Sequence, residues 1–104
     1  MNETLFTNVE LYDGTGAPPF AAEVAVRDDK IAAIGKKGAF TRTGATVVDG
    51  KGFALTPGFV DVHGHSDGKA VTVPTGDSKI SQGVTTEVTG NCGFSDYLDE
   101  IKDN

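Results

Sequence analysis

The sequence is short of cysteine, of basic residues and of long apolar runs, and each shortage excludes a class of protein. Cys92 is the only cysteine, so the chain cannot form an intrachain disulfide. No apolar stretch is long enough to span a bilayer, and the start lacks the cationic and apolar regions of a secretory signal, which predicts a cytoplasmic setting. Nine Lys and Arg against fifteen Asp and Glu give a net charge of −6 without a basic stripe. That balance argues against nucleic acid or an anionic membrane as a partner.

The first region, residues 1–56, is predicted to form short strands separated by turns. Glycine is abundant, at 14 of 104 residues, and favours such tight connections. Asp28-Asp29 joins two apolar stretches and predicts a β-hairpin. Several short strands at close spacing indicate a sheet-on-sheet module, or half of one. The strands are expected at Leu5–Tyr12, Ala22–Arg27, Lys30–Ile34, Thr46–Asp49 and Phe53–Leu55.

The second region, residues 57–104, has a different pattern. Phe59–His63 is a compact apolar strand of the kind that parallel sheets bury. A short helix is expected near Asp77–Gln82, closed by Gly83, and Val84–Thr89 is a β-branched strand. A strand, a helix-containing connection of about twenty residues and a second strand are typical of a right-handed βαβ crossover. A complete (β/α)8 barrel needs about 250 residues and cannot be contained in this chain.

The clearest candidate for chemistry is the His63-Gly64-His65 motif at the end of the first apolar strand. If the strand continues, residues i and i+2 point the same way, so the two imidazoles project side by side. Two convergent imidazole nitrogens are a common half-site for zinc, and Asp61 would share their direction and could orient one ring. Two nearby histidines can also simply lie in solvent. The carboxyl end of a buried strand is where barrel enzymes hold their sites, which favours a metal site.

Cys92 follows the second strand of this region. If the two strands are parallel neighbours, their carboxyl ends lie about 5 Å apart, so the thiol emerges at the same rim as His63 and His65. A thiolate is a strong zinc ligand, whereas a lone cysteine is more often a buried apolar residue. The shared rim favours ligation. We therefore predict a metal site made of His63, His65 and Cys92, and we assign no catalytic residue.

A hydrolytic site also needs a general base and usually further ligands, and the nearby carboxylates are Asp67 and Glu87. Asp67 closely follows the histidine pair and could face the site, although a solvated loop aspartate fits the sequence equally well. Glu87 alternates out of phase with its neighbours in the strand. The sequence leaves its direction open.

Several segments resemble one known family. Pro57–His65 resembles the signature that opens the barrel of the amidohydrolase superfamily. Lys79–Thr86, followed by Gly90–Ser95 with its Gly-Asn-Cys-Gly run, is similar to the narrower N-acyl-D-amino-acid deacylase (D-aminoacylase) branch. The front end, with Asp13–Gly16 and Lys30–Gly35, resembles the β-sandwich that precedes this barrel. The likeness covers most of the chain.

This resemblance implies a fold and an activity. The fold would be mainly β, with residues 1–56 as the N-terminal part of the amidohydrolase β-sandwich and residues 57–104 as the first βαβ unit of a truncated (β/α)8 barrel. The activity would be zinc-dependent hydrolysis of the amide bond of N-acyl-D-amino acids. His63 and His65 would match the paired histidines of the first metal position. Cys92 would match the cysteine that takes the place of a carboxylated lysine.

Two other interpretations remain open. The chain could be a stand-alone β-rich module with a structural or oligomeric role and a vestigial site, because open sheet edges invite pairing between copies. It could also bind metal through its three donors without turnover. The family's later histidine ligands and its catalytic aspartate have no counterpart here, so we expect the 104-residue chain by itself to be inactive.

Overall fold

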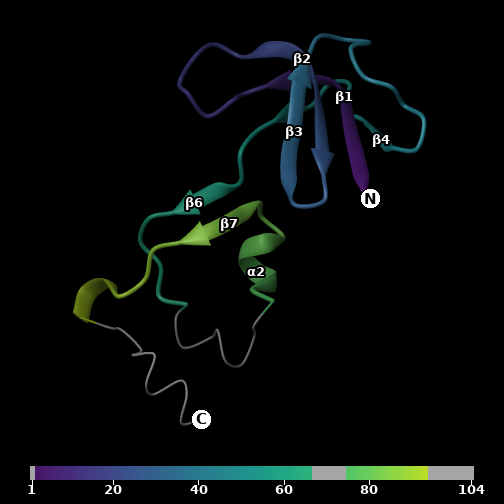
Figure 1. Ribbon diagram of the computed structural model, residues 1–104. Helices are drawn as coiled ribbons and strands as arrows, with labels where there is room; N and C mark the ends of the chain where they lie inside the picture. Colours follow the sequence, from purple (N-terminus) through teal and green to yellow (C-terminus); the bar gives the residue numbers. More distant parts are fainter. Residues whose placement is uncertain (1, 67–74, 94–104) are drawn as a thin grey trace. The chain divides into compact units, whose positions relative to one another are not determined.

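Figure 1 shows the computed structural model, which describes residues 2–66 and 75–93. The chain divides into two units, Met1–Pro57 and Gly58–Asn104, and each contains its own sheet. Among the described residues, no helix is long and apolar enough to cross a membrane. The described part is mainly β, as the sequence predicts. The assignment of the second unit to the start of a barrel stays a prediction.

The first unit is a single five-stranded mixed sheet built around its first strand. The strand order is β3-β2-β1-β4, and β5 also pairs with β1, beyond the end of β4. β1 is antiparallel to β2 and parallel to β4 and β5. The positions agree with the strands expected from the sequence to within a few residues: β1 (Glu3–Leu11), β2 (Phe20–Arg27), β3 (Lys30–Gly35), β4 (Thr46–Asp49) and β5 (Ala54–Leu55).

The predicted hairpin is formed by β2 and β3. The two strands pair antiparallel, with Arg27 opposite Lys30, so only two residues make the turn. Asp28 adopts a left-handed backbone with φ of 53°, which aspartate tolerates better than most residues because its short polar side chain can bond locally. Its Oδ1 accepts a hydrogen bond from the backbone N–H of Asn2 at 3.2 Å, and this bond fastens the turn to the start of β1.

The main apolar cluster of the first unit lies on one face of β1 and β2. Val9 and Leu11 are buried two residues apart on β1, as the two-residue period of a strand requires, whereas Leu5, opposite Ala25 and before the register shift between Phe6 and Val9, is buried outside this cluster. Ala22 and Val24 of β2 are buried as well, and both belong with Val9 and Leu11 to one cluster. Full burial of a large aliphatic side chain contributes about 2 kcal/mol, so these few residues dominate the stability of the unit.

One charged side chain, Glu23 of β2, is completely buried. Its Oε1 accepts hydrogen bonds from the backbone N–H of Gly38 at 2.9 Å and from Nη2 of Arg42 at 2.7 Å. These bonds, that of Gly38 first, hold the pKa of Glu23 below its ordinary value despite burial. Glu23 thereby anchors the connection between β3 and β4 to the sheet.

The second unit contains a parallel pair of strands with a short helix between them in the sequence. The pairing of β6 with β7 and the order strand, helix, strand agree with the predicted βαβ pattern. Gly83, with φ of 83°, follows the helix and donates its N–H to the carbonyl of Ile80. This agrees with the prediction that a glycine ends the helix. The described elements are β6 (Phe59–Asp61), α2 (Asp77–Ile80), β7 (Val84–Glu87) and the 3-10 turn η1 (Asn91–Gly93).

Candidate metal centre

The ends of β6 and β7 set the positions of the candidate ligands. Asp61, the last residue of β6, pairs with Glu87, the last residue of β7. Two further backbone hydrogen bonds extend the pairing: the N–H of Val88 donates to the carbonyl of Asp61 at 2.8 Å, and the N–H of Gly64 donates to the carbonyl of Val88 at 3.0 Å. The histidine motif and the segment after β7 are therefore held side by side by main-chain bonds.

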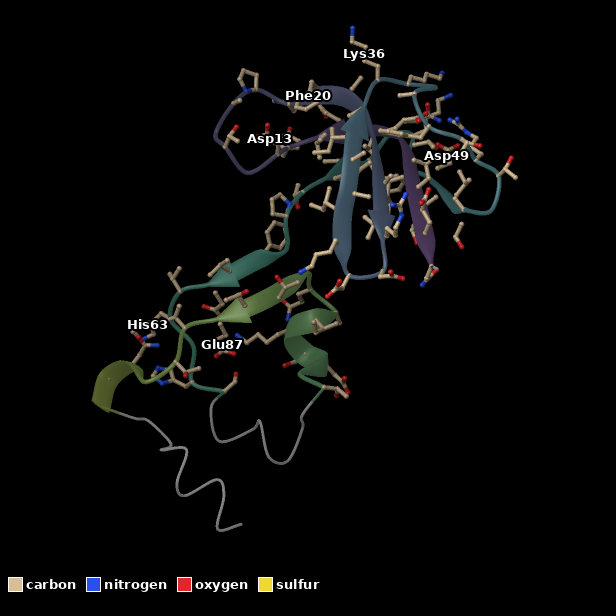
Figure 2. All side chains as sticks on the ribbon, viewed as in Figure 1. Asp13, Phe20, Lys36, Asp49, His63 and Glu87 are labelled. Carbon is tan, nitrogen blue, oxygen red and sulfur yellow. The ribbon has the colours of Figure 1, made fainter. Side chains whose placement is uncertain are left out.

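The histidines do not lie on a continuing strand, contrary to the prediction of a strand through His63. β6 ends at Asp61 because the Asp61 carboxylate accepts the backbone N–H of His63 at 3.1 Å and bends the chain there. The expected role of Asp61 changes accordingly, since this contact supports the main chain of His63. Figure 2 shows His63 beyond the end of β6.

The structure nevertheless brings the three predicted ligands together. One donor atom from each of His63, His65 and Cys92 lies within 4.8 Å of the other two. The thiol Sγ is 3.4 Å from Nε2 of His63, and the two imidazole ring centroids are 5.3 Å apart in an edge-to-face arrangement. All three side chains are exposed. Two imidazoles and a thiol are donors that zinc accepts, so the chemistry of the cluster fits that metal.

The backbone at Cys92 is unusual. Its φ of 58° lies in the left-handed region, where a residue other than glycine, asparagine or aspartate costs about 1–2 kcal/mol. Gly90 and Gly93, with φ of 81° and 75°, flank it in the same region. Such strained residues persist where the surroundings fix them, and they are frequent at ligand-binding sites.

Asp61 also joins the site to the helix. Its Oδ2 accepts a hydrogen bond from Nζ of Lys79 in α2 at 2.7 Å, within a partly exposed ion pair. The Lys79 bond first, and the His63 N–H second, lower the pKa of Asp61, while the Asp61 carboxylate raises the pKa of Lys79. Both charges are therefore fixed at neutral pH, and together they tie α2 to the carboxyl end of β6.

The two nearby carboxylates have different outcomes. Asp67 lies outside the described residues. Glu87, labelled in Figure 2, is half-buried, and its Oε1 accepts the backbone N–H of Ser66 at 3.1 Å. Its carboxylate also occupies the space that a side chain at position 64 would need, so any larger residue there would force Glu87 to shift. Glu87 is thus packed against the histidine motif, a direction that the sequence left open.

Sequence reasoning missed Asn91. Its side-chain Nδ2 donates to the carbonyl of Gly64 at 3.1 Å and to the carbonyl of Val88 at 2.9 Å. The only signal in the sequence was its place directly before Cys92. Strand periodicity and metal-ligand spacing say nothing about a side chain that binds main-chain carbonyls.

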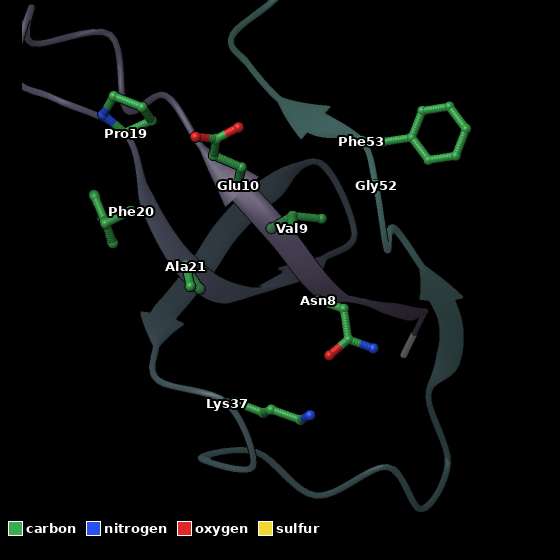
Figure 3. Close-up of a pocket in the computed structure, with 10 residues that line it drawn as sticks. Asn8, Val9, Glu10, Pro19, Phe20, Ala21, Lys37, Gly52 and Phe53 are labelled. Carbon is green, nitrogen blue, oxygen red and sulfur yellow. The ribbon is translucent and has the colours of Figure 1, made fainter.

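A groove of about 530 Å³ lies elsewhere, within the first unit (Figure 3). Its lining is mostly apolar, with Glu10 and Lys37 as its charged members. It contains no histidine or cysteine and therefore offers no imidazole or thiolate for a metal. Its lining residues are Asn8, Val9, Glu10, Pro19, Phe20, Ala21, Ala22, Lys37, Gly52 and Phe53.

Comparison with known proteins gives a consistent set of relatives. No protein-family model matches the chain. N-acyl-D-aspartate deacylase from Alcaligenes xylosoxydans xylosoxydans is 44% identical over 92 residues, which make up 88% of this chain and 18% of that protein. The chain thus spans about a fifth of the length of the relatives it matches.

Solved structures give the same result. A D-aminoacylase whose binuclear metal centre was studied superposes with a TM-score of 0.79 at 43% identity, over 88% of this chain and 19% of that one. N-acyl-D-glutamate deacylase from Bordetella bronchiseptica, complexed with zinc and a phosphonate inhibitor, superposes with a TM-score of 0.76 at 48% identity and the same coverage.

These likenesses confirm the family predicted from the sequence. D-aminoacylase is described as defining a subset of the amidohydrolases, and the chain matches it in sequence and in fold. The chain belongs to this N-acyl-D-amino-acid deacylase branch and corresponds to an N-terminal portion of it.

Proposed function

We propose that this chain provides the first metal ligands of a zinc-dependent hydrolase that cleaves the amide bond of N-acyl-D-amino acids. The observation that carries the proposal is the convergence of His63, His65 and Cys92, whose donor atoms lie within 4.8 Å of one another. They come from two separate segments, one after β6 and one after β7. If the two histidines were merely exposed neighbours, there would be no reason for the Cys92 thiol, 29 residues from His63 in the sequence, to lie beside them.

His63, His65 and Cys92 are the residues that would hold the zinc. A zinc ion bound there would supply Lewis acidity, which polarises an amide carbonyl and makes a water molecule acidic at neutral pH. The chain's own contribution is to position the donors: Asp61 fixes the main chain of His63, and the left-handed turn presents Cys92 beside it. The remaining ligands and the base would come from parts of the enzyme beyond these residues.

The relatives support the proposed substrate class, since they are deacylases of N-acyl-D-aspartate and N-acyl-D-glutamate and a D-aminoacylase. All three names specify an amide of a D-amino acid. We extend that class to the complete enzyme, and we keep the cytoplasmic setting expected from the sequence. The choice of acyl group and amino acid would depend on residues outside this chain.

Metal content tests the ligand assignment. The purified chain, dialysed against zinc and then against buffer, should retain the metal. His63→Ala, His65→Ala and Cys92→Ser should each lower zinc affinity by at least about tenfold, since even the loss of a residue that only supports a ligand costs about 10–100-fold in affinity. Ser81→Ala, on the exposed turn after α2, is the control and should bind like the unmodified chain. Zinc content unchanged by all three ligand variants would contradict the assignment.

Acetate release tests the activity. With added zinc, the 104-residue chain should release no acetate from N-acetyl-D-aspartate or N-acetyl-D-glutamate, because three ligands without a base do not complete a hydrolytic site. Turnover by the purified chain that Cys92→Ser abolishes would show that these residues suffice for catalysis. The claim that further residues are required would then be wrong.

A structural role is the second candidate, and one observation favours it. Within the described part of the chain, β3 pairs only with β2, so its other edge presents unpaired main-chain groups. Ile31 and Ile34 on this strand are 69% and 48% exposed. An open edge with apolar side chains is a site where two copies can pair.

A further inference from the structure

We propose that Asn91 is a positioning residue, which fastens the Cys92 turn to the histidine motif and so sets the spacing of the three donors. The inference rests on the proposed metal-binding function. Asn91 is not itself a ligand in this assignment. It acts on the metal site only through the main chain to which it is bonded.

The side chain of Asn91 links two main-chain segments, and we call this link the clamp. Its Nδ2 donates to the carbonyl of Gly64 at 3.1 Å and to the carbonyl of Val88 at 2.9 Å. A side-chain amide nitrogen carries two N–H groups, so it can serve both carbonyls. Gly64 stands between the two histidines, and Val88 directly follows β7. A single side chain thus connects the segment that holds the imidazoles to the strand end that leads to the thiol.

The clamp acts where the regular pairing stops. The last pair of the β6–β7 ladder is Asp61 with Glu87, and the bond from Gly64 to Val88 extends it by one step. Beyond that step the chain passes through Gly90 and Gly93, both with left-handed φ. Two such glycines give the turn many alternative conformations, whereas a fixed Asn91 restrains the residue that directly follows it, Cys92.

The strain at Cys92 gives a second reason for a clamp. A cysteine with φ of 58° tends to relax toward an extended or right-handed backbone. Such a rotation would move Sγ away from Nε2 of His63, from which it now lies 3.4 Å. Asn91 is half-buried, whereas Cys92 and Gly93 are exposed, and its bond to the Gly64 carbonyl is partly shielded from water.

Both bonds depend on the amide nitrogen of Asn91. Each partner is a carbonyl oxygen, so the side chain must donate twice. An ionised aspartate has the same shape but cannot donate, and its charge would face two acceptors. Alanine removes the contacts without adding charge. The two variants therefore separate the loss of donors from the effect of a new charge near the metal.

The experiment uses Co²⁺ as the probe in the full 104-residue chain. Thiolate ligation to Co²⁺ gives a charge-transfer absorption in the near ultraviolet, which reports directly on Cys92. Asn91→Ala and Asn91→Asp should weaken Co²⁺ binding about 10–100-fold, the usual effect of removing an outer-shell partner, and should reduce the thiolate band at saturating metal. The matched control is Gln82→Glu, because the Gln82 amide also donates to a main-chain carbonyl, that of Ser78 at 2.6 Å, but in the turn after α2.

A double-variant comparison separates positioning from general folding. In a Cys92→Ser background, Asn91→Ala should have little further effect on Co²⁺ affinity, because the ligand that it positions is gone. An undiminished effect in that background, or a full thiolate band in Asn91→Ala, would overturn the inference. If the unmodified chain binds no Co²⁺, the proposed function fails. Hydrogen exchange of the Asn91 side-chain amide with solvent then tests the positioning role by itself: slow exchange supports it and fast exchange refutes it.

Discussion

Sγ of Cys92 lies 3.4 Å from Nε2 of His63, although 29 residues separate the two in the sequence. The contact exists because β6 and β7 run parallel and end at the same edge, so the segments that follow them meet. Neither residue is buried, and the buried apolar residues in the described part of the chain all belong to the first unit. Their proximity depends on main-chain hydrogen bonds and on a few side chains that bind the main chain.

Gly64→Ala should disturb the site without changing a ligand. A Cβ at this position would overlap the Glu87 carboxylate, and such crowding costs about 1–3 kcal/mol. We expect weaker Co²⁺ binding and a lower unfolding midpoint in urea, followed by circular dichroism. Adding Glu87→Ala makes room, so the double variant should recover part of the loss. A Gly64→Ala chain with unchanged metal affinity and midpoint would show that Glu87 moves aside freely.

Glu23→Gln should change how the stability of the first unit depends on pH. The bonds from Gly38 and Arg42 hold the pKa of Glu23 below its ordinary value of 4.5, so the unfolded chain takes up the proton more readily. The stabilisation is therefore present above about pH 4.5 and is lost as the pH falls through the lower, folded pKa. Thermal melts should show a lower Tm for the variant at neutral pH and a flatter acid limb.

The control for this prediction is Glu10→Gln, an exposed carboxylate on β1. It should keep both the Tm at neutral pH and the acid limb of the unmodified chain. Equal acid limbs in Glu23→Gln and the unmodified chain would mean that the buried carboxylate does not govern the pH dependence.

Leu5→Ala should be among the most damaging changes in the first unit. Leu5 is fully buried, and the removal of a buried leucine side chain costs about 3 kcal/mol through lost transfer energy and the cavity that remains. Ile31→Ala is the comparison, since that side chain is 69% exposed and its loss should shift stability by no more than about 0.5 kcal/mol. Urea unfolding measures both, and similar shifts in the two variants would contradict the assigned core.

The free edge of β3 predicts self-association. A charged side chain on an exposed strand is a known defence against edge pairing, so Ile31→Lys should reduce the oligomeric fraction seen by analytical ultracentrifugation. Ile31→Val keeps the apolar, β-branched character and should associate like the unmodified chain. A monomer at every concentration for the unmodified chain would remove the support for the oligomeric role.

The sequence predicted the elements of the fold well because their signals are local. Thr46–Asp49 is β-branched and lies between turn residues, and β4 has these bounds in the structure. The helix near Asp77–Gln82 was also predicted, although α2 itself ends at Ile80. The proximity of Cys92 to the histidines was predictable too, since parallel neighbouring strands end at one edge.

The remaining features depend on contacts between distant segments. The end of β6 at Asp61 is set by that residue's own side chain, whose capture of the His63 N–H competes with strand pairing. Glu23 is buried because Arg42 and Gly38, 19 and 15 residues later, fold over it. Asn91 bonds to the carbonyl of Gly64, 27 residues earlier. Periodicity and motif spacing carry no information about such contacts.

Because the metal ligands follow β6 and β7, metal binding depends on the register in which these two parallel strands pair. Each residue of a strand advances it by about 3.3 Å, so a slip of two residues would carry Cys92 about 7 Å along the edge, beyond the reach of a common ion. A chain misaligned in this way would keep its strand content and lose its affinity for metal. Bound Co²⁺ would therefore distinguish correctly aligned molecules from misaligned ones that circular dichroism cannot tell apart.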